Sequence, residues 1–454
     1  MPVSPARAAA FEILLRVERE QSYASELLHS ARFAKLSRVD HALATELAMG
    51  VLRWWSWIDR QIEEASSQKL ARLDDEVLIA LRLGVYQLRF LSRVPARAAI
   101  FESVELVKKA RKSSAAPFVN AVLRKIAETT DGEDSSGCPE RPFAGIETSS
   151  DAIALAQNSA HPQWLVARWI EQYGIAEAKQ ICTYDQHPPP TAIRIDDGEC
   201  LNELAREGVK LGPGRLLSSA RTVLAGDVTR TRAYRQGRLA IQDESSQLVA
   251  LLVRQGQKIL DCCAAPGGKT ALLARRNPQA LVIATDLHVH RARRMRDLID
   301  VSNVRTVAAD ARQLPFSGAF DRILADVPCS GTGTLARNPE IKWRLKPDDL
   351  EDLRARQTAI LKSALAQLAS GGRLVYSTCS MEREENEAVV EPALNESADY
   401  SIIDCRDELE KLRDDGELCV HNVETLCDGP YLRTLPGVQA GDGFFAAIIA
   451  RKHV

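Results

Sequence analysis

The sequence predicts a multidomain protein with three folded parts. An all-α helical bundle comes first, followed by a small α+β subdomain and an α/β domain built on a doubly wound parallel sheet. Three observations predict this architecture. The 454 residues are too many for one hydrophobic core. Apolar residues in the first quarter of the chain recur at helical spacing. From Leu239 onward, apolar strands alternate with amphipathic helices, the pattern of a doubly wound sheet.

The composition excludes several classes of protein. The content of 45% hydrophobic and 26% charged residues is that of an ordinary globular chain. No apolar run is long enough to span a membrane, and the first ten residues do not resemble a secretory signal. The ten cysteines include no Cys-x-x-Cys pair of the kind that binds zinc. We therefore expect a cytoplasmic protein with reduced thiols, no membrane contact and no metal. Because no association stripe is evident, we also expect a monomer.

Residues 1–130 form the predicted helical domain. Leu14, Leu47 and Leu81 lie in three of its helical apolar stripes. This part carries 20 Lys and Arg residues against 15 Asp and Glu residues, whereas the whole chain has a net charge of −2. A mildly basic helical module is compatible with RNA contact, and a plain bundle without its own activity fits equally well.

Residues 131–150 lose all periodicity and gain Gly, Ser and acidic residues, so we expect a linker there. Residues 151–238 are expected to form one helical and small α+β subdomain. Its clearest strand is Ala192–Ile195, and further strands are expected over 209–211 and 222–225. The last domain then covers residues 239–454.

The first strand of that domain leads into a loop of small residues. The predicted strand, Lys258–Cys262, precedes the loop Ala264–Lys269, and a helix is expected to begin at Thr270. Small residues let the backbone approach a ligand closely, and amides at a helix start favour polar or negative groups. The loop lacks the Gly-x-Gly-x-x-Gly fingerprint and the spacing of a phosphate-binding Walker loop.

Acidic residues follow the next two predicted strands. The strand 281–285 leads into Asp286, where sheets of this type hold a ribose diol. The strand Val304–Ala308 is followed by Asp310, which is placed to accept from an adenine amino group. Together with the loop, these residues predict an adenosyl cofactor. The alternative is that both carboxylates only cap helices.

Two cysteines follow core strands of the same sheet. Cys329 lies in the sequence Asp-Val-Pro-Cys-Ser-Gly that begins at Asp326, and Cys379 lies in Tyr-Ser-Thr-Cys-Ser. Because the carboxyl ends of parallel strands face one crevice, both thiols should meet beside the cofactor. This geometry predicts covalent chemistry on a bound base. The alternative for either cysteine alone is an inert buried thiol.

Methylation of cytosine at C5 requires such a set of groups. Thiolate addition to C6 makes C5 nucleophilic, after which the C5 proton must leave and the thiol must be expelled. We expect Asp326 to contact the base edge, and a helix directly after Cys379 to help ionise its thiol. Enzymes that methylate exocyclic amines carry a polar-Pro-Pro-aromatic tetrad at this strand end, so the Asp-Val-Pro-Cys string excludes them. The spacing does not decide which thiol is the nucleophile.

Several strings resemble the two-cysteine RNA cytosine-C5 methyltransferases, whose catalytic domain is a Rossmann-like class I methyltransferase fold. The resemblance covers residues 239–454 nearly end to end. The strings are Asp261–Thr270, Asp326–Gly333, Arg337–Trp343, Tyr376–Met381, Glu385–Glu387, Leu435–Gly437 and Gly441–Phe445.

The N-terminal part resembles the NusB-like RNA-binding bundle of antitermination factors in the strings Ala42–Leu47, Leu81–Leu88 and Phe118–Arg124. A NusB-like bundle fused to this catalytic domain is similar to the bacterial 16S rRNA methyltransferases of the Fmu/Sun type. The partner that this resemblance implies is 16S rRNA before full subunit assembly, contacted by residues 1–130 and 151–238, with no DNA. The alternative is a non-catalytic RNA-binding or antitermination-type factor.

The resemblance also assigns roles to the site residues. It implies that Cys379 is the nucleophile and that Cys329 releases the product. It implies that the cofactor is S-adenosyl-L-methionine. The residues expected to contact it are Cys263, Ala264, Ala265, Pro266, Gly267, Gly268, Lys269, Asp286, Asp310 and Asp326.

Overall fold

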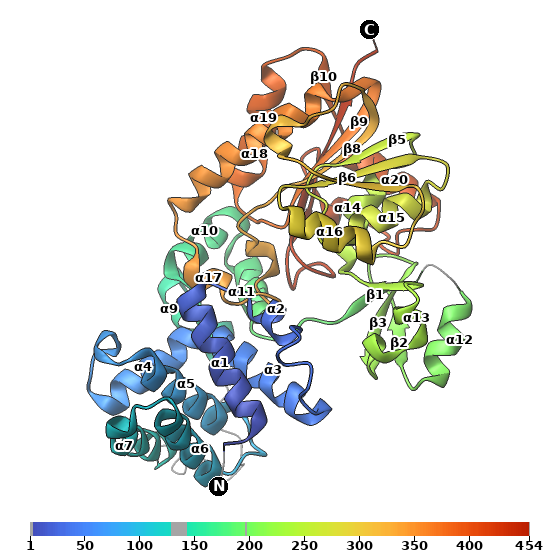
Figure 1. The fold of residues 1–454 in the computed structure, drawn as a ribbon. Coiled ribbons are helices and arrows are strands. Elements are labelled where there is room, and N and C mark those ends of the chain that lie inside the picture. The colour runs from blue at the N-terminus through green and yellow to red at the C-terminus, as the bar shows by residue number, and fades with distance from the viewer. Residues whose placement is uncertain (1–2, 129–142, 196–197, 454) are drawn as a thin grey trace. The chain divides into compact units, whose positions relative to one another are not determined.

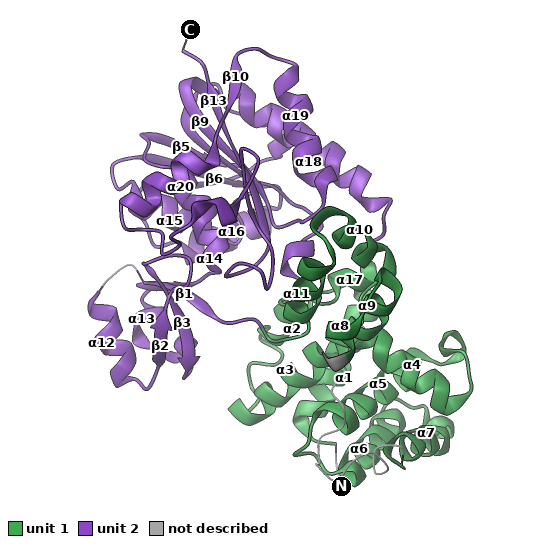
Figure 2. Cartoon of the chain, turned by 180° about the vertical axis from the view of Figure 1, so that it is seen from behind, with its two compact units in different colours: residues 1–188, 335–344 green, residues 189–334, 345–454 purple. Residues whose placement is uncertain are grey.

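The computed structural model describes residues 3–128, 143–195 and 198–453 (Figure 1). The chain divides into two compact units, which Figure 2 colours separately. Unit 1 contains residues 1–188 and 335–344, and unit 2 contains residues 189–334 and 345–454. The chain therefore leaves unit 2, contributes a short segment to unit 1 and returns.

Unit 1 is helical throughout its described residues, which confirms the expected all-α domain. A few helix starts are capped by side chains, as where the Ser37 hydroxyl accepts from the backbone N–H of Asp40 at 3.1 Å. The helices are α1 (Pro5–Glu20), α2 (Ala24–Leu28), α3 (Arg38–Arg53), α4 (Trp55–Ser66), η1 (Leu70–Arg72), α5 (Asp75–Phe90), α6 (Ala96–Lys109), η2 (Ser113–Ala115), α7 (Ala116–Glu128), α8 (Phe143–Thr148), α9 (Ala152–Ser159), α10 (Gln163–Tyr173), α11 (Ile175–Asp185) and α17 (Ile341–Arg344).

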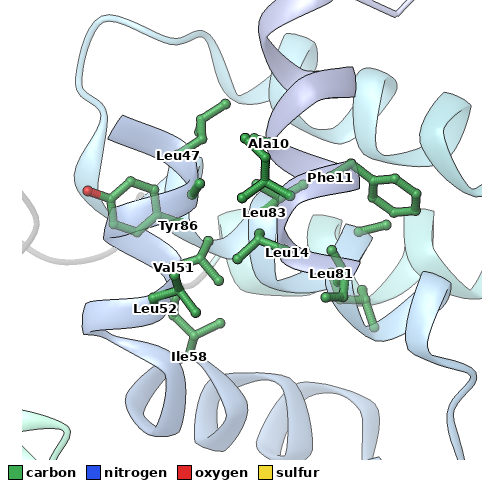
Figure 3. Close-up of a cluster of buried hydrophobic side chains, with 14 of the residues drawn as sticks. Ala10, Phe11, Leu14, Leu47, Val51, Leu52, Ile58, Leu81, Leu83 and Tyr86 are labelled. Carbon is green, nitrogen blue, oxygen red and sulfur yellow. The ribbon is translucent and has the colours of Figure 1, made fainter. Parts of the chain in front are cut away.

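The core of unit 1 lies between α1, α3, α4 and α5. Leu14, Leu47, Leu52, Ile58 and Leu83 are completely buried there, and Figure 3 shows their side chains in one cluster. These positions include the stripes that predicted the helices. Helical spacing brings such residues onto one face, and burial of that face holds the bundle together.

The two compact units divide the chain after Pro188, inside the range 151–238 that was expected to form one subdomain. Of the expected linker, residues 131–142 lie outside the described residues, and Phe143–Thr148 form helix α8. Helices α9 to α11 belong to unit 1 rather than to the α+β subdomain. The physical reason is hydrogen bonding to the first bundle: the Gln186 amide donates to the Arg53 carbonyl at 3.0 Å, and the Arg60 guanidinium donates to the Gln157 carbonyl at 2.8 Å.

Residues 335–344 complete unit 1 and end in α17. The ammonium of Lys342 donates to the Arg53 carbonyl at 3.0 Å, and the Trp343 indole N–H donates to the Leu52 carbonyl at 2.6 Å. The carboxylate of Glu340 accepts from the backbone N–H of Ala24 at 2.7 Å. The string Arg337–Trp343 resembles part of the catalytic domain in sequence. These hydrogen bonds nevertheless hold it in the helical unit.

Unit 2 begins with the expected α+β subdomain, an antiparallel sheet in the order β2-β3-β1-β4. Ile193, Leu204, Val228 and Leu239 form its buried core. The strand Ala192–Ile195 has the expected bounds. The elements are β1 (Ala192–Ile195), α12 (Glu199–Arg206), β2 (Lys210–Pro213), β3 (Ala220–Ala225), η3 (Val228–Arg230), α13 (Arg232–Arg235) and β4 (Leu239–Ile241).

The rest of unit 2 surrounds a mixed sheet, nine-stranded over the described residues, with the order β11-β12-β13-β9-β8-β5-β6-β7 and β10 paired to β13. Its strands are β5 (Lys258–Asp261), β6 (Leu281–Asp286), β7 (Val304–Ala308), β8 (Phe320–Asp326), β9 (Leu368–Thr378), β10 (Tyr400–Ile403), β11 (Cys427–Asp428), β12 (Tyr431–Thr434) and β13 (Phe444–Arg451). Strands β5 to β9 are parallel, which confirms the predicted α/β domain. Strands β10 to β13 add an antiparallel extension beyond β9.

Helices cover both faces of this sheet. Apolar residues of α14, α15 and α20 pack on one face and those of α18 and α19 on the other. The helices are α14 (Glu244–Leu252), α15 (Gly268–Arg276), α16 (Val289–Leu298), η4 (Ala311–Gln313), η5 (Thr332–Thr334), α18 (Asp349–Ala366), η6 (Arg383–Glu385), α19 (Glu387–Asn395), α20 (Cys405–Asp414) and η7 (Val423–Leu426). Among the helices of the described residues, none is both long and apolar enough to cross a lipid bilayer.

Candidate active site

The two predicted cysteines meet at the carboxyl ends of adjacent strands. Strands β8 and β9 are parallel neighbours with Asp326 in register with Ser377. This register places Cys329 and Cys379 side by side, and their sulfurs share a hydrogen bond at 3.3 Å. Both thiols are half-buried, although the strands that carry them are buried. The structure therefore brings together the pair that the strand-end argument predicts.

A buried glutamate connects the two cysteine loops. Each cysteine precedes a serine, and the hydroxyls of Ser330 and Ser380 lie 3.0 Å apart. Both hydroxyls donate to Oε2 of Glu385, a side chain with no exposed surface. Oε1 of Glu385 accepts from the Ser330 backbone N–H at 2.8 Å and from the Gln357 amide at 2.9 Å. The separation of the two thiols is thus fixed by one carboxylate.

Asp326 lies at the end of β8 and bonds to two side chains. Its Oδ1 accepts from the Ser377 hydroxyl at 2.7 Å, and its Oδ2 pairs with the ammonium of Lys269 at 2.8 Å. Burial opposes the charge of Lys269, but the carboxylate of Asp326 outweighs it and raises the pKa of Lys269. Lys269 therefore remains a cation beside the thiols.

The small-residue loop follows β5 as expected. Gly267 has a φ of +109°, and a Cβ there would lie 2.7 Å from the side chain of Ile299, so only glycine fits. Helix α15 begins at Gly268, two residues before the expected start. The Thr270 hydroxyl of this helix donates to Asp261 at 2.7 Å, and burial raises the pKa of Asp261 to about 7.

Cys263 marks where the acidic residues converge. Its pKa is raised well above its usual range, first by burial and then by the carboxylates of Asp261, Asp326, Asp286 and Asp310. The structure thus gathers the carboxylates from four strand ends around one position. Such a cluster fits a ligand with hydroxyl and amino donors better than it fits an anion.

The two cofactor carboxylates have different surroundings. Asp286 is 9% exposed and accepts from the backbone N–H of His288 through Oδ1 at 2.8 Å. Asp310 is more exposed and pairs with Arg312, with 2.7 Å between Oδ2 and Nη2. The hydrogen bonds from Arg312 lower the pKa of Asp310. Asp310 also caps the turn η4 by accepting from the Arg312 backbone N–H, so part of its bonding capacity is in use.

The helix expected directly after Cys379 is absent. Residues 380–386 form a loop with the short turn η6, and α19 begins only at Glu387. The reason is local hydrogen bonding: the Ser380 hydroxyl accepts from the Glu382 N–H at 3.0 Å, and the Thr378 hydroxyl accepts from the Ser380 N–H at 3.2 Å. The helix N-terminus that was expected directly after Cys379 is therefore not present.

Cys329 holds its proton more strongly than a free cysteine does. The largest cause of its raised pKa is the hydrogen bond with Cys379, followed by burial and by the charges of Glu385 and Asp326. Cys329 is therefore a protonated thiol at neutral pH.

Sequence reasoning did not identify the residues that hold the cysteine loops together, namely Glu385, Gln357, Ser330 and Ser380. Ser330 and Ser380 were visible as a repeated Cys-Ser pair, and Glu385 opens the string Glu-Asn-Glu. The bonds between them cross three separate segments of chain, and no local pattern shows such contacts.

Comparison with known proteins identifies the family. A family model described as "16S rRNA methyltransferase RsmB/F" matches residues 248–450. The "Probable ribosomal RNA small subunit methyltransferase B" of Bacillus subtilis is 34% identical over 415 residues, which cover 88% of this chain and 90% of that protein. The chain belongs to the RsmB/F family of 16S rRNA methyltransferases. This membership confirms the predicted rRNA methyltransferase.

Two further RsmB/F-family relatives match along nearly the whole chain. The ribosomal RNA small subunit methyltransferase B of Vibrio cholerae is 31% identical and covers 98% of each chain, and that of Escherichia coli O1:K1 is 30% identical and covers 92% of each. The N-terminal residues 4–128 match the NusB family, and residues 161–224 match a ferredoxin-like domain of RsmF/B-like methyltransferases. The crystal structure of PH0851 has the same fold, with a TM-score of 0.78 at 21% identity over 98% of this chain and 99% of that one.

Proposed function

We propose that this RsmB/F-family protein methylates C5 of a cytosine in 16S rRNA, with S-adenosyl-L-methionine as the methyl donor and Cys379 as the covalent nucleophile. The observation that carries the proposal is the pair of half-buried sulfurs 3.3 Å apart at adjacent strand ends. Methylation of an amine or a hydroxyl requires no thiol, whereas addition to C6 of a pyrimidine requires a nucleophile of this kind.

The residues around the loop fit the cofactor. Because Gly267 and its neighbours are small, the backbone of the loop can lie close to the ligand. Asp286 uses Oδ1 for the His288 N–H, so Oδ2 is available to a ribose hydroxyl. Asp310 can accept from the adenine amino group only by sharing its carboxylate with Arg312. When bound, S-adenosyl-L-methionine supplies an electrophilic methyl group on a sulfonium.

In the first step, the Cys379 thiolate forms a bond to C6, and N3 of the base gains a proton. The pair of Asp326 and Lys269 is suited to share that proton with N3, because Asp326 keeps Lys269 protonated despite burial. C5 then takes the methyl group. The RNA is now attached to the protein through the Cys379 sulfur.

In the release step, Cys329 acts as the base. Its raised pKa arises first from the hydrogen bond with Cys379, and that bond is lost when Cys379 becomes a thioether. Cys329 can then lose its proton to water and take the C5 proton as a thiolate. The C5–C6 double bond forms again, N3 returns its proton, and Cys379 leaves as a thiolate. One proton is released in total, which balances the neutral methylcytosine and the loss of the sulfonium charge.

The experiment is a pair of cysteine substitutions. We expect Cys379→Ala to abolish methyl transfer to 16S rRNA and to form no adduct. We expect Cys329→Ala to accumulate a protein–RNA adduct that survives denaturing electrophoresis, because addition proceeds and release does not. Cys419→Ala, at an exposed cysteine of the same unit, is the control and should behave as wild type. Methylation by Cys379→Ala at the wild-type rate would contradict the proposal.

The form of the substrate follows from the same assay. Base chemistry at C5 requires the cytosine to leave its stack, which single-stranded or loosely structured RNA permits. We therefore expect naked or partly assembled 16S rRNA to be methylated faster than intact small subunits.

A further inference from the structure

Helix α16 presents an unusually basic outer surface. It follows Asp286 after two residues and has the sequence Val-His-Arg-Ala-Arg-Arg-Met-Arg-Asp-Leu. Asp297 is its only acidic residue. The exposed basic or imidazole side chains on or directly before the helix are His288, His290, Arg291, Arg293, Arg294 and Arg296.

The opposite face of α16 supports the cofactor loop. Met295 is buried in one cluster with Ala264 of the loop and Ala284 of β6. A Cβ on Gly267 would meet both Met295 and Ile299, at 3.0 and 2.7 Å. The inner face of α16 thus packs against the cofactor loop. The charged outer face can be substituted without removing these packing contacts.

The arginines of α16 differ from several other arginines of unit 2. Some of those guanidinium groups are paired with carboxylates, as Arg254 and Arg373 are with Glu408. On α16, only Arg296 has such a pair, with the adjacent Asp297 at 3.3 Å. Within the described residues, the side chains of Arg291, Arg293 and Arg294 have no hydrogen bond or ion pair, and only their backbone groups are bonded, as in the helix. Like charges held on adjacent turns repel each other, and an external polyanion offsets that repulsion.

We propose that the outer face of α16 binds the phosphate backbone of the RNA substrate beside the cofactor end of the sheet. This inference rests on the proposed RNA substrate. A guanidinium matches phosphate oxygens with two parallel hydrogen bonds, which a hydrated ammonium does not provide. The ten-residue helix is about 15 Å long, which is enough for roughly two or three successive phosphates. Such contacts position the RNA and carry no base specificity.

The test is the triple variant R291Q/R293Q/R294Q in the full chain, with binding of unmodified 16S rRNA measured at several salt concentrations. Each single-strand phosphate contact contributes about 0.7 to the slope of log K against log salt, so we expect the slope to fall by about 2. Affinity should fall most at low salt. KM for RNA should rise while kcat is retained, and calorimetry should show unchanged binding of S-adenosylhomocysteine.

The matched control is R354Q/R406Q/R413Q, which removes the same charge from arginines that are paired with Glu351, Glu424 and Asp414. Its salt slope should equal that of the wild type. Equal slopes for the α16 variant and the wild type, or equal losses in both triple variants, would overturn the inference. If the α16 triple variant loses cofactor binding, the three single variants must each lower the slope by about 0.7. Failure of the wild type to transfer methyl to RNA would instead overturn the proposed function.

Discussion

Glu385 shows how one side chain can set the geometry of a two-residue reaction. Both thiols lie one residue before a serine, and both serine hydroxyls bond to the same carboxylate oxygen. The meeting of Cys329 and Cys379 could be predicted from sequence, because parallel strands end at one edge of a sheet. The role of Glu385 could not be predicted from sequence, because its partners come from three segments whose approach depends on the whole fold.

We predict that Glu385→Gln lowers the rate of methyl transfer by about a hundredfold, the typical cost of a misplacement of about 1 Å. A glutamine offers one acceptor oxygen and turns an N–H group toward the remaining donors, so the bonds to both cysteine loops cannot all survive. Because release needs Cys329 placed against the adduct, the fraction of protein linked to RNA should rise above that of the wild type. Single-turnover kinetics and denaturing gels measure both quantities.

The control for Glu385 is Glu244→Gln. Glu244 is also a buried glutamate of unit 2 and accepts from the backbone N–H groups of Arg215, Leu216 and Leu217. We expect this change to lower stability without changing the adduct fraction. A wild-type adduct fraction and rate in Glu385→Gln would show that the carboxylate does not position the thiols.

At the scale of elements, one buried carboxylate links α20 to the sheet domain in addition to the apolar packing of the helix. Glu408 accepts from Arg254 at 3.0 Å, Arg373 at 2.8 Å and Lys411 at 2.7 Å. The parallel strands and their helices were predictable because apolar runs alternate with amphipathic stretches. The absence of a helix after Cys379 could not be predicted, because hydroxyl groups bonded to nearby backbone compete with helix formation there.

We predict that Glu408→Gln destabilises unit 2 in a pH-dependent way. Burial alone would raise the pKa of Glu408, but the three cations outweigh it and lower the pKa to about 2. The unfolded chain titrates near 4.5. Above pH 4.5 the wild type therefore holds about 3 kcal/mol of extra stability, which is lost as the pH falls from about 4.5 to 2. Urea unfolding of both proteins across this range measures the difference.

Glu410→Gln, at an exposed position of the same helix, should leave stability unchanged. A difference between the wild type and Glu408→Gln that stays constant from pH 7 to pH 2 would contradict the assigned electrostatic origin.

At the scale of the whole molecule, the chain order does not match the order of the compact units. Residues 335–344 belong to the helical unit although unit 2 precedes and follows them. Their sequence could be matched to the catalytic domain, but nothing in a local pattern shows which core a ten-residue segment joins. Helices α9 to α11 illustrate the same difficulty, because their place in unit 1 depends on distant carbonyl partners such as that of Arg53.

Lys342 provides a test of this segment. Burial, opposed by Asp185, lowers its pKa to about 7, whereas the unfolded side chain titrates near 10.5. Between these values the unfolded chain holds more protons, so the lysine makes stability rise with pH. We predict that Lys342→Met removes this rise and is the more stable protein at pH 6. Tryptophan fluorescence, recorded during thermal unfolding between pH 6 and 10, measures how stability depends on pH. The exposed Lys346→Gln is the control. If the stability of Lys342→Met and that of the wild type changed with pH in parallel, the low pKa assigned to Lys342 would be wrong.

The segment 335–344 also constrains how the polypeptide can mature during translation. Helices α1 to α3 leave the ribosome early, yet the bonds from Glu340, Lys342 and Trp343 to Ala24, Arg53 and Leu52 require residues made hundreds of codons later. Domains usually mature in the order of synthesis. Here the first domain must wait for the second, so a nascent chain arrested before residue 335 leaves an incomplete helical core for chaperones or proteases to recognise.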